Sequence, residues 1–146
     1  MQPSLAMRKS IYLDINIVID ILDTNRPNSQ SAKALLKHLS YENIKIVISE
    51  DMLSTIFYIV KNKQAVLEFF QLIQKRWLIS PFGQDVIKEA IKLSLAKNLD
   101  FEDTAQCLCA KENGCMALIT NDHRFYDCGI KQYTSDEALK NISTFH

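Results

Sequence analysis

Short apolar runs alternate with longer amphipathic segments along most of the chain. Runs rich in branched or aromatic side chains are typical of buried strands, and they span 11–13, 44–48, 77–79, 116–120 and 130–133. Between them, apolar residues recur at spacings of three and four, which predicts helices over 16–22, 31–40, 49–61, 64–76, 84–97, 101–111 and 135–140. Strands that alternate with helices predict an α/β fold, with a central parallel sheet of four to five short strands and helices on both faces.

Two of these helices carry more detailed expectations. Ser49 is expected to be the N-cap of the helix over 49–61, because its hydroxyl can accept a hydrogen bond from an amide of the first turn. Glu50 and Asp51 suit the positive end of that helix. In the helix over 84–97, the apolar residues are expected to face the core; they are Val86, Ile87, Ala90, Ile91 and Leu95.

The size and charge of the chain narrow its class. Its 146 residues, 47% of them apolar, favour a single domain, which we expect over 11–146 after a tail over 1–10. Basic and acidic residues number 17 each, so contact with phosphate must come from local patches. No apolar run reaches the roughly 18 residues of a membrane span. The start of the chain lacks the apolar core of a signal peptide, so we expect a cytoplasmic protein.

The four cysteines are expected to be reduced and buried. Cys107 and Cys109 lie two positions apart on a predicted helix and therefore point to different faces, which argues against a zinc site. Disulfides are rare in a reducing compartment. We therefore expect these two residues, together with Cys115 and Cys128, to pack as small hydrophobic side chains.

Three acidic residues share one place relative to the predicted sheet. Asp14 and Asp122 follow the strands over 11–13 and 116–120, and Asp103 lies in the first turn of a helix. In open α/β sheets, sites form at the carboxyl ends of the strands. We therefore expect these carboxylates to meet at one edge of the sheet.

Each acid also has a purely structural interpretation. Asp100 with Asp103 resembles a capping box, and either Asp14 or Asn16 can cap the helix that follows. Residues 121–122 can form an ordinary turn. These interpretations explain each position separately, but they do not explain why three acids are delivered to one edge.

A cluster of carboxylates has a physical cost that points to a metal ion. Two carboxylates about 4 Å apart repel by roughly 4 kcal/mol at an effective dielectric constant of 20. A hard cation such as Mg²⁺ or Mn²⁺ prefers oxygen ligands and removes this repulsion. Mg²⁺ also gathers substrate phosphates, so the expected chemistry is phosphodiester hydrolysis by a metal-activated water.

Three motifs surround these acids: L-D-I-N-I-V-I-D at 13–20, D-F-E-D-T-A-Q at 100–106 and T-N-D at 120–122. In this order and spacing they resemble the PIN-domain family, and the resemblance covers about 11–135. Many small members of that family are the toxin ribonucleases of toxin–antitoxin pairs. The resemblance implies a compact α/β fold, a Mg²⁺- or Mn²⁺-dependent endoribonuclease acting on single-stranded RNA, and an antitoxin protein as a partner.

The resemblance also implies roles for individual residues. Asp14, Asp103 and Asp122 match the family's metal-binding acids. Asn16 and Thr120 match its polar supporting positions, which orient the first acid and the substrate or water. The family's mechanism implies in-line attack by water, with a 5′-phosphate and a 3′-hydroxyl as products.

One position departs from the family pattern. A further acid usually precedes the apolar-aromatic run on the helix after the second strand, but here the run over 56–60 follows Thr55. Asp51 lies four residues earlier, on the same helix face. Either Asp51 is a fourth metal ligand, or Glu50 reaches the site with its longer side chain, or the site is one acid short. Favourable placement at a helix start explains both acids equally well.

Basic residues near the acids are candidate contacts for the RNA backbone. Arg124 lies beside Asp122, and Lys61, Lys63 and Arg26 lie in predicted loops or at helix ends. Solvated surface charge is the more common explanation for any one of them.

Two other functions fit parts of the pattern. A PIN-like module that binds RNA or a protein without cleavage fits Thr55 at the acid position. A receiver- or phosphatase-like domain with Asp14 as the phospho-acceptor fits the first acid but leaves Asp103 unused.

Self-association is a separate question. An apolar helix pair could extend to a second copy in a homodimer, although core packing explains the same residues. The aromatic residues concerned are Phe57, Tyr58, Phe69 and Phe70.

Overall fold

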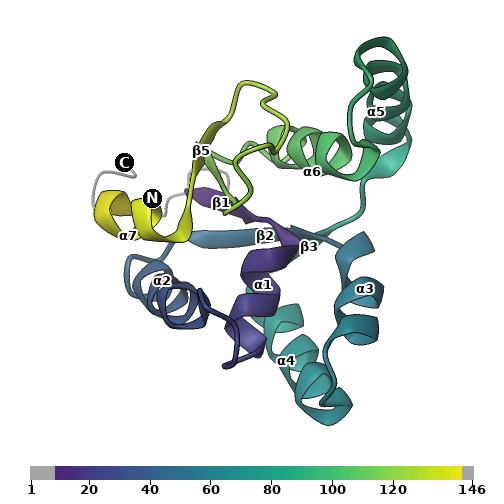
Figure 1. Cartoon of the computed structure of the whole chain (residues 1–146). Helices are drawn as coiled ribbons and strands as arrows, with labels where there is room; N and C mark the ends of the chain where they lie inside the picture. The colour runs from purple at the N-terminus through teal and green to yellow at the C-terminus, as the bar shows by residue number, and fades with distance from the viewer. Residues whose placement is uncertain (1–8, 143–146) are drawn as a thin grey trace, which may run out of the picture.

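Five strands form one parallel sheet in the computed structural model, which describes residues 9–142 (Figure 1). The strands are β1 (Ser10–Leu13), β2 (Lys45–Ser49), β3 (Leu78–Ser80), β4 (Ala117–Ile119) and β5 (Lys131–Tyr133). Their order is β3-β2-β1-β4-β5, and each neighbouring pair is parallel. The winding direction reverses at β1, so the carboxyl ends of β1 and β4 form the switch point where such sheets bind ligands.

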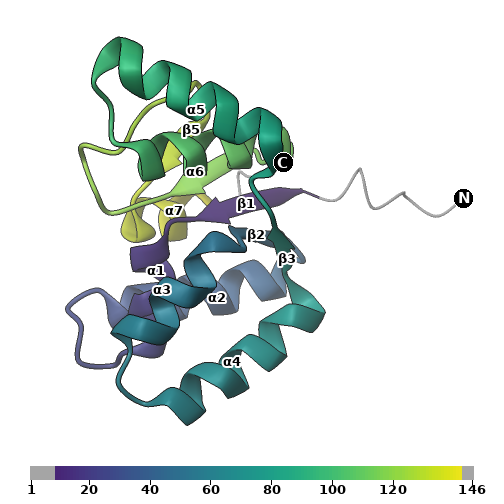
Figure 2. The same cartoon turned by 90° about the vertical axis from the view of Figure 1, so that its right-hand side faces the viewer.

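The helices cover both faces of the sheet, as predicted. They are α1 (Ile15–Leu22), α2 (Ser29–Tyr41), α3 (Asp51–Ile59), α4 (Lys63–Arg76), α5 (Gly83–Lys97), α6 (Phe101–Glu112) and α7 (Ser135–Asn141). Helices α1 to α4 lie on one side, and α5 and α6 lie on the other (Figure 2). None of the helices within residues 9–142 combines the length and the apolar character that a membrane crossing requires.

The main core lies around β1. Ile11, Tyr12 and Leu13 are at most 1% exposed, because helices cover both faces of this central strand. The expected tail over 1–10 overlaps β1 at Ser10, and residues 1–8 lie outside the described part of the chain, as does His146. The other predicted boundaries fall within two residues of those observed, because apolar periodicity and helix caps are local signals.

Ser49 is the last residue of β2 and does not cap the following helix. Glu50 occupies the cap position without a side-chain hydrogen bond, and α3 ends at Ile59, before Lys61. The hydroxyl of Ser49 accepts a hydrogen bond from Nε2 of Gln106 at 3.1 Å. The prediction was wrong because pairing with β3 continues the strand through Ser49.

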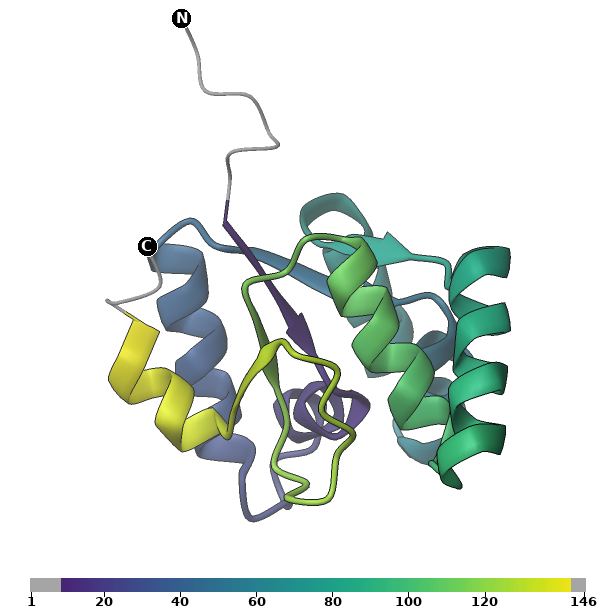
Figure 3. The same ribbon diagram turned by 90° about the horizontal axis from the view of Figure 1, so that it is seen from above.

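Helix α5 buries a much narrower face than its sequence predicts. Val86 and Ala90 are buried, but Ile87, Ile91 and Leu95 are 39%, 46% and 82% exposed. The helix packs chiefly against α6, beside which it lies in Figure 3, and shares a small second core with it. The prediction that all five apolar residues face inward was wrong because α5 packs chiefly against α6, which leaves its outer face exposed.

Two of the four cysteines are bonded to each other. Cys107 of α6 and Cys128 of the β4–β5 loop form a disulfide, with Cα atoms 6.0 Å apart. Cys109 and Cys115 are buried free thiols, as expected. The prediction of four thiols was wrong for the first pair because it rested on the expected compartment and not on spatial proximity. The disulfide ties the loop that follows β4 to α6.

Candidate functional site

Asp14 is a buried carboxylate at the end of the central strand. Its backbone N–H donates to the carbonyl of Ile119 at 3.0 Å. Its Oδ1 accepts from the N–H of Ile15 at 2.7 Å, and its Oδ2 accepts from the hydroxyl of Thr120 at 2.9 Å. Burial raises the pKa of Asp14, and the charges of Asp122 and Asp20 raise it further, while the two hydrogen bonds oppose the rise. Asp14 is therefore both a helix cap and a member of an acidic cluster.

Thr120 connects Asp14 to the loop that carries Asp122. The buried Thr120 hydroxyl donates to Asp14 and accepts from the N–H of Asp122 at 3.1 Å. Asp122 is exposed, and its Oδ1 accepts from the N–H of Arg124 at 2.9 Å, as in an Asx-type turn. One hydroxyl thus sets the orientation of the first acid and the backbone position of the third.

Asp100 and Asp103 divide two tasks at the start of α6. Oδ1 of Asp100 accepts from the N–H of Asp103 at 2.9 Å, so Asp100 is the N-cap. The Asp103 carboxylate does not complete a capping box, and within the described chain it accepts no hydrogen bond. The structural interpretation therefore holds for Asp100 but does not account for the side chain of Asp103.

The pKa of Asp103 reflects both burial and the neighbouring acids. Burial of this half-buried carboxyl, together with the charges of Asp100, Asp14 and Asp122, raises its pKa to about 7. The charge of Asp122 also raises the pKa of Asp14. The three predicted acids therefore lie within electrostatic reach of one another at the switch point.

Glu102 is an acid of the site that the sequence reasoning left out. Partial burial raises its pKa, and the charges of Asp51, Asp100 and Asp14 raise it further. Asp51 is the exposed first residue of α3, which follows β2. Glu102 therefore lies within electrostatic reach of both Asp51 and Asp14. The available signal was its place in the same first helical turn as Asp103.

Asn16 lies at the surface and contacts Arg26. Its Oδ1 accepts from Nη2 of Arg26 at 3.4 Å, and within residues 9–142 no hydrogen bond joins it to Asp14. Nε of Arg26 forms a 2.6 Å ion pair with the buried Asp20. From the sequence, Arg26 was a candidate contact for RNA phosphate. In the structure its guanidinium instead pairs with Asp20, a buried acid of α1.

The other basic candidates differ in their freedom. Nζ of Lys63 donates to the carbonyl of Phe57, and to those of Tyr58 and Val60 at 3.3 and 2.7 Å, so it caps the end of α3. Lys61 and Arg124 are exposed, and neither forms a salt bridge in the described part of the chain. These two remain available to a ligand.

A buried hydrogen-bond network holds α6 against the sheet below the acids. The hydroxyl of Tyr12 in β1 donates to Oε1 of Gln106, and Gln106 donates in turn to Ser49 of β2. Burial raises the pKa of Tyr12 well above its ordinary value, so the phenol keeps its proton. Because Gln106 lies one turn after Asp103, this network fixes the position of the acidic turn.

The donor chemistry of this edge suits a hard cation, but the ligands are not fully gathered. Carboxylate oxygens are the ligands that Mg²⁺ and Mn²⁺ prefer, and burial together with the charges of Asp100, Asp14 and Asp122 raises the pKa of Asp103. Within residues 9–142, no three His, Cys, Asp or Glu side chains are grouped closely enough to hold one ion. Asp103 and the exposed Asp122 must therefore turn toward Asp14 for one ion to contact all three.

The aromatic residues considered for a dimer fall into two classes. Phe57 and Tyr58 are 38% and 86% exposed on α3, whereas Phe69 and Phe70 of α4 pack against the main core. The four therefore do not form one exposed surface.

Comparison with known proteins places this fold in a family. The PIN domain model matches residues 11–131, which is most of the chain. Ribonuclease VapC1 of Aquifex aeolicus (strain VF5) is 28% identical over 141 residues, which cover 93% of this chain and 97% of that protein. The strand order also differs from the 2-1-3-4-5 order of receiver domains, which argues against the receiver-like alternative.

Solved structures share the fold at low sequence identity. Mycobacterium tuberculosis VapC20, described as a sarcin–ricin loop cleaving toxin, matches with a TM-score of 0.68 and 12% identity, over 82% of this chain and 95% of that one. VapBC2 of Rickettsia felis, bound to a promoter DNA fragment, matches with a TM-score of 0.65 and 18% identity, over 86% of this chain and 98% of that one. A toxin–antitoxin complex of Klebsiella pneumoniae matches with a TM-score of 0.66 and 18% identity, over 86% of this chain and 97% of that one. The family match, the sheet order and the acids at the switch point agree that this chain belongs to the PIN-domain family.

Proposed function

We propose that this protein is a divalent-metal-dependent endoribonuclease that hydrolyses phosphodiester bonds of single-stranded RNA. The observation that carries the proposal is that Asp14, Asp103 and Asp122 lie within electrostatic reach of one another at the carboxyl ends of β1 and β4, where burial and the charges of neighbouring acids raise the pKa of Asp103 to about 7. Membership of the PIN-domain family and likeness to a protein named as a ribonuclease support it.

Asp14, Asp103 and Asp122 would hold Mg²⁺ or Mn²⁺, with Asp51 and Glu102 as further acids beside them. When bound, the ion supplies an activated water and neutralises charge on the leaving oxygen. The buried Asp14 is a fixed ligand, because both of its oxygens accept hydrogen bonds from Ile15 and Thr120. A fixed first ligand with movable partners allows the site to close when the cation binds.

The protonation of Asp103 couples metal binding to pH. With a pKa of about 7, the carboxyl carries a proton in a large fraction of molecules at neutral pH when no cation is present. Ligands must be deprotonated to bind a metal, so cation affinity is expected to rise as the pH rises through about 7. Arg124 and Lys61 are exposed cations that can contact RNA phosphates.

A cleavage assay tests the proposal directly. Purified protein is incubated with end-labelled single-stranded RNA in Mg²⁺, in Mn²⁺ and in a chelator. We expect cleavage only with the cations, and its loss in Asp14→Asn with an unchanged circular dichroism spectrum. Asp85→Asn, which removes an exposed acid in the first turn of α5, is the matched control and is expected to cleave normally.

One observation favours a second function. Thr55 occupies the position where the family carries a further acid, and no three-ligand group is preformed within residues 9–142. A module that binds RNA or a protein without cutting would fit these features. Absence of cleavage with every divalent cation, together with retained RNA binding, would replace the nuclease proposal by this one.

The proposal extends to a biological role as the toxin of a toxin–antitoxin pair. Its support is the likeness of the fold to VapC20 and to the toxin–antitoxin complexes of Rickettsia felis and Klebsiella pneumoniae. An antitoxin protein would then be its partner. Induced expression is expected to arrest bacterial growth, and Asp14→Asn is expected to abolish the arrest. Normal growth with abundant active enzyme would contradict the toxin role while leaving the nuclease intact.

A further inference from the structure

A cavity of about 810 Å³ lies between α2 and α4, at the amino end of β2. Lys45, the first residue of β2, lines it, whereas Asp51 follows the carboxyl end of the same strand. The five residues of β2 separate these ends by about 13 Å. The cavity is therefore distinct from the acidic edge, by which we mean Asp14, Asp51, Glu102, Asp103 and Asp122 beside the carboxyl ends of the strands.

The cavity is strongly cationic. Five basic side chains line it and no acidic residue does: Lys33, Lys37, Lys45, Lys75 and Arg76. The single salt bridge found within residues 9–142 joins Arg26 to Asp20, so none of the five has an ionic partner there. Because the chain as a whole has a net charge of zero, this concentration of uncompensated cations makes the cavity a place where a polyanion is attracted.

Aromatic side chains accompany the cations. Tyr41, at the end of α2, is 86% exposed at the cavity. Trp77 lines the opposite wall, and its ring packs edge-on against Phe69 with centroids 5.6 Å apart. Trp77 is half-buried, so the exposed ring is that of Tyr41. An exposed aromatic ring beside a cationic groove is the combination that binds single-stranded nucleic acid, because a base stacks on the ring while phosphates meet the cations.

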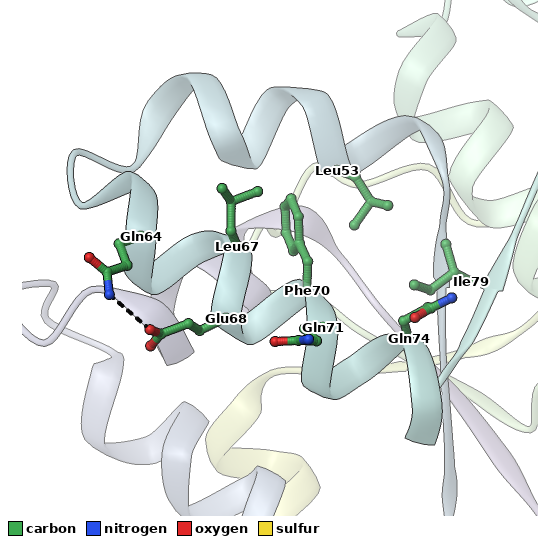
Figure 4. Close-up of a pocket in the computed structure, with 8 residues that line it drawn as sticks. All are labelled: Leu53, Gln64, Leu67, Glu68, Phe70, Gln71, Gln74 and Ile79. Carbon is green, nitrogen blue, oxygen red and sulfur yellow. Dashed lines mark hydrogen bonds between the residues drawn. The ribbon is translucent and has the colours of Figure 1, made fainter.

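A second cavity shows that this combination is not general to the surface. It measures about 610 Å³, lies between α3 and α4, and has no basic residue in its lining (Figure 4). Its polar residues are mainly amides, and Nε2 of Gln64 donates to Glu68 at 3.1 Å. Residues of α4 line both cavities, yet only the first cavity is basic. Its positive charge therefore comes from its own lining residues on α2, on β2 and at the end of α4.

We propose that the cavity between α2 and α4 is a second RNA-binding site, which holds a single-stranded segment of the substrate away from the acidic edge. The proposal rests on the proposed function and names where nucleotides flanking the cleavage point bind. Its consequence is a dependence on substrate length: an RNA long enough to reach both places binds more tightly than one that occupies the acidic edge alone.

Fluorescence anisotropy with a labelled 20-nucleotide poly-uridine RNA tests the binding, in chelator so that no cleavage occurs. The double variant Lys37→Glu/Lys75→Glu is expected to raise the Kd about 10-fold or more. The slope of log K against log salt is expected to fall by about 1.4, the value for two lost phosphate contacts on a single strand. Tyr41→Ala is expected to raise the Kd about 10-fold through lost stacking.

The control variant is Lys88→Glu/Lys92→Glu, which makes the same charge change on exposed residues of α5, across the sheet. Its Kd is expected to stay within about threefold of that of the parent, because this variant changes the net charge of the protein but leaves the cavity intact. If both double variants weaken binding equally, the cavity has no special role and the inference is overturned.

Cleavage of two RNAs separates this inference from the proposed function. The double variant at Lys37 and Lys75 is expected to cleave a 5-nucleotide RNA like the parent, but to show a raised KM on the 20-nucleotide RNA. If the parent cleaves neither RNA yet binds the longer one through these lysines, the nuclease proposal fails and the inference stands. If cleavage is normal and RNA binding ignores both lysines, the inference fails and the nuclease stands. Binding of a 20-residue poly-glutamate through these lysines, with none of RNA, would assign the cavity to an acidic polypeptide and overturn the inference.

Discussion

The two ends of β2 present opposite charges that are built in opposite ways. At its carboxyl end lies the acidic edge, whose buried Asp14 is held by short hydrogen bonds to Ile15 and Thr120. At its amino end, the basic cavity is lined by basic side chains of α2, β2 and α4, which have no ionic partners among residues 9–142. Catalysis requires fixed atoms, whereas attraction of a polyanion requires only charge at short range. The comparison predicts that changes at the first end alter rates, and that changes at the second end alter affinity.

The largest expected effect is the loss of cleavage in Asp14→Asn. The rate is expected to fall by at least about 1000-fold, as when one member of a catalytic group is removed. Anisotropy with the 20-nucleotide RNA should show a Kd within about twofold of the parent, because the basic cavity is untouched. A large loss of RNA affinity in this variant would break the comparison, since one site would then serve both functions.

The disulfide sharpens the comparison because it belongs to the acidic edge alone. It closes a sequence separation of 21 residues and holds the β4–β5 loop, which carries Asp122, to α6. Cys128→Ser is expected to lower the free energy of unfolding by about 3 kcal/mol in oxidising buffer. Urea denaturation measures this free energy. The reduced parent protein is the control, and its free energy of unfolding should equal that of the variant.

The same variant is expected to cleave RNA more slowly while its RNA affinity stays unchanged. The reason is that the loop bearing Asp122 loses its covalent tie to the helix bearing Asp103, whereas α2 and α4 are not involved. Equal stability of the oxidised and reduced parent protein would contradict a structural role for this bond.

An intermediate effect is expected in Thr120→Val. The valine removes the hydroxyl that donates to Asp14 and accepts from the N–H of Asp122. Titration calorimetry with Mn²⁺ is expected to show an affinity about 10- to 100-fold lower, the usual result of losing a partner that orients a metal ligand. Thr120→Ser keeps the hydroxyl and should restore most of the affinity. A serine variant as weak as the valine variant would show that packing, and not the hydrogen bond, is what matters.

The smallest expected effect concerns the charge of Asp103. Its pKa is raised in the folded protein from 3.8 to about 7, so the folded state holds the proton more tightly than the unfolded state. The carboxylate therefore costs stability, a cost that is absent below about pH 4 and fully present above about pH 7.

Asp103→Asn is accordingly expected to raise the free energy of unfolding at pH 8 without metal, by on the order of 1 kcal/mol after screening of a half-buried group. The gain should vanish near pH 4, and Mg²⁺ should stabilise the parent but not the variant. Thermal unfolding over this pH range measures both. A variant less stable than the parent at pH 8 would show that Asp103 is not under electrostatic strain.

The acidic edge could be predicted from the sequence to the extent that it is built from local signals. Asp14 and Asp122 follow apolar runs, and parallel strands bring their carboxyl ends to one edge. Asp100 was recognisable as a cap because its hydrogen bond to the N–H of Asp103 spans a single turn. Glu102 was missed because its raised pKa comes from burial and from the charge of Asp51, which lies on a different helix.

The failed predictions have a common cause. The outward face of α5 and the bond between Cys107 and Cys128 depend on which segments meet. The pairing of Arg26 with the buried Asp20 likewise depends on the path of the loop after α1. Each of these features needs a distance between parts of the chain that local pattern does not contain.

The sequence by itself determined the alternation of strands and helices and the placing of three acids beside strand and helix ends. Hydrophobic periodicity and capping act over a few residues, so they are written directly in the order of side chains. The tertiary structure decided the strand order, the burial and crowding that raise the pKa of Asp103, and the cavity to which α2, β2 and α4 each bring cations. The reason is that charges interact through space, and only folding sets the distances between them.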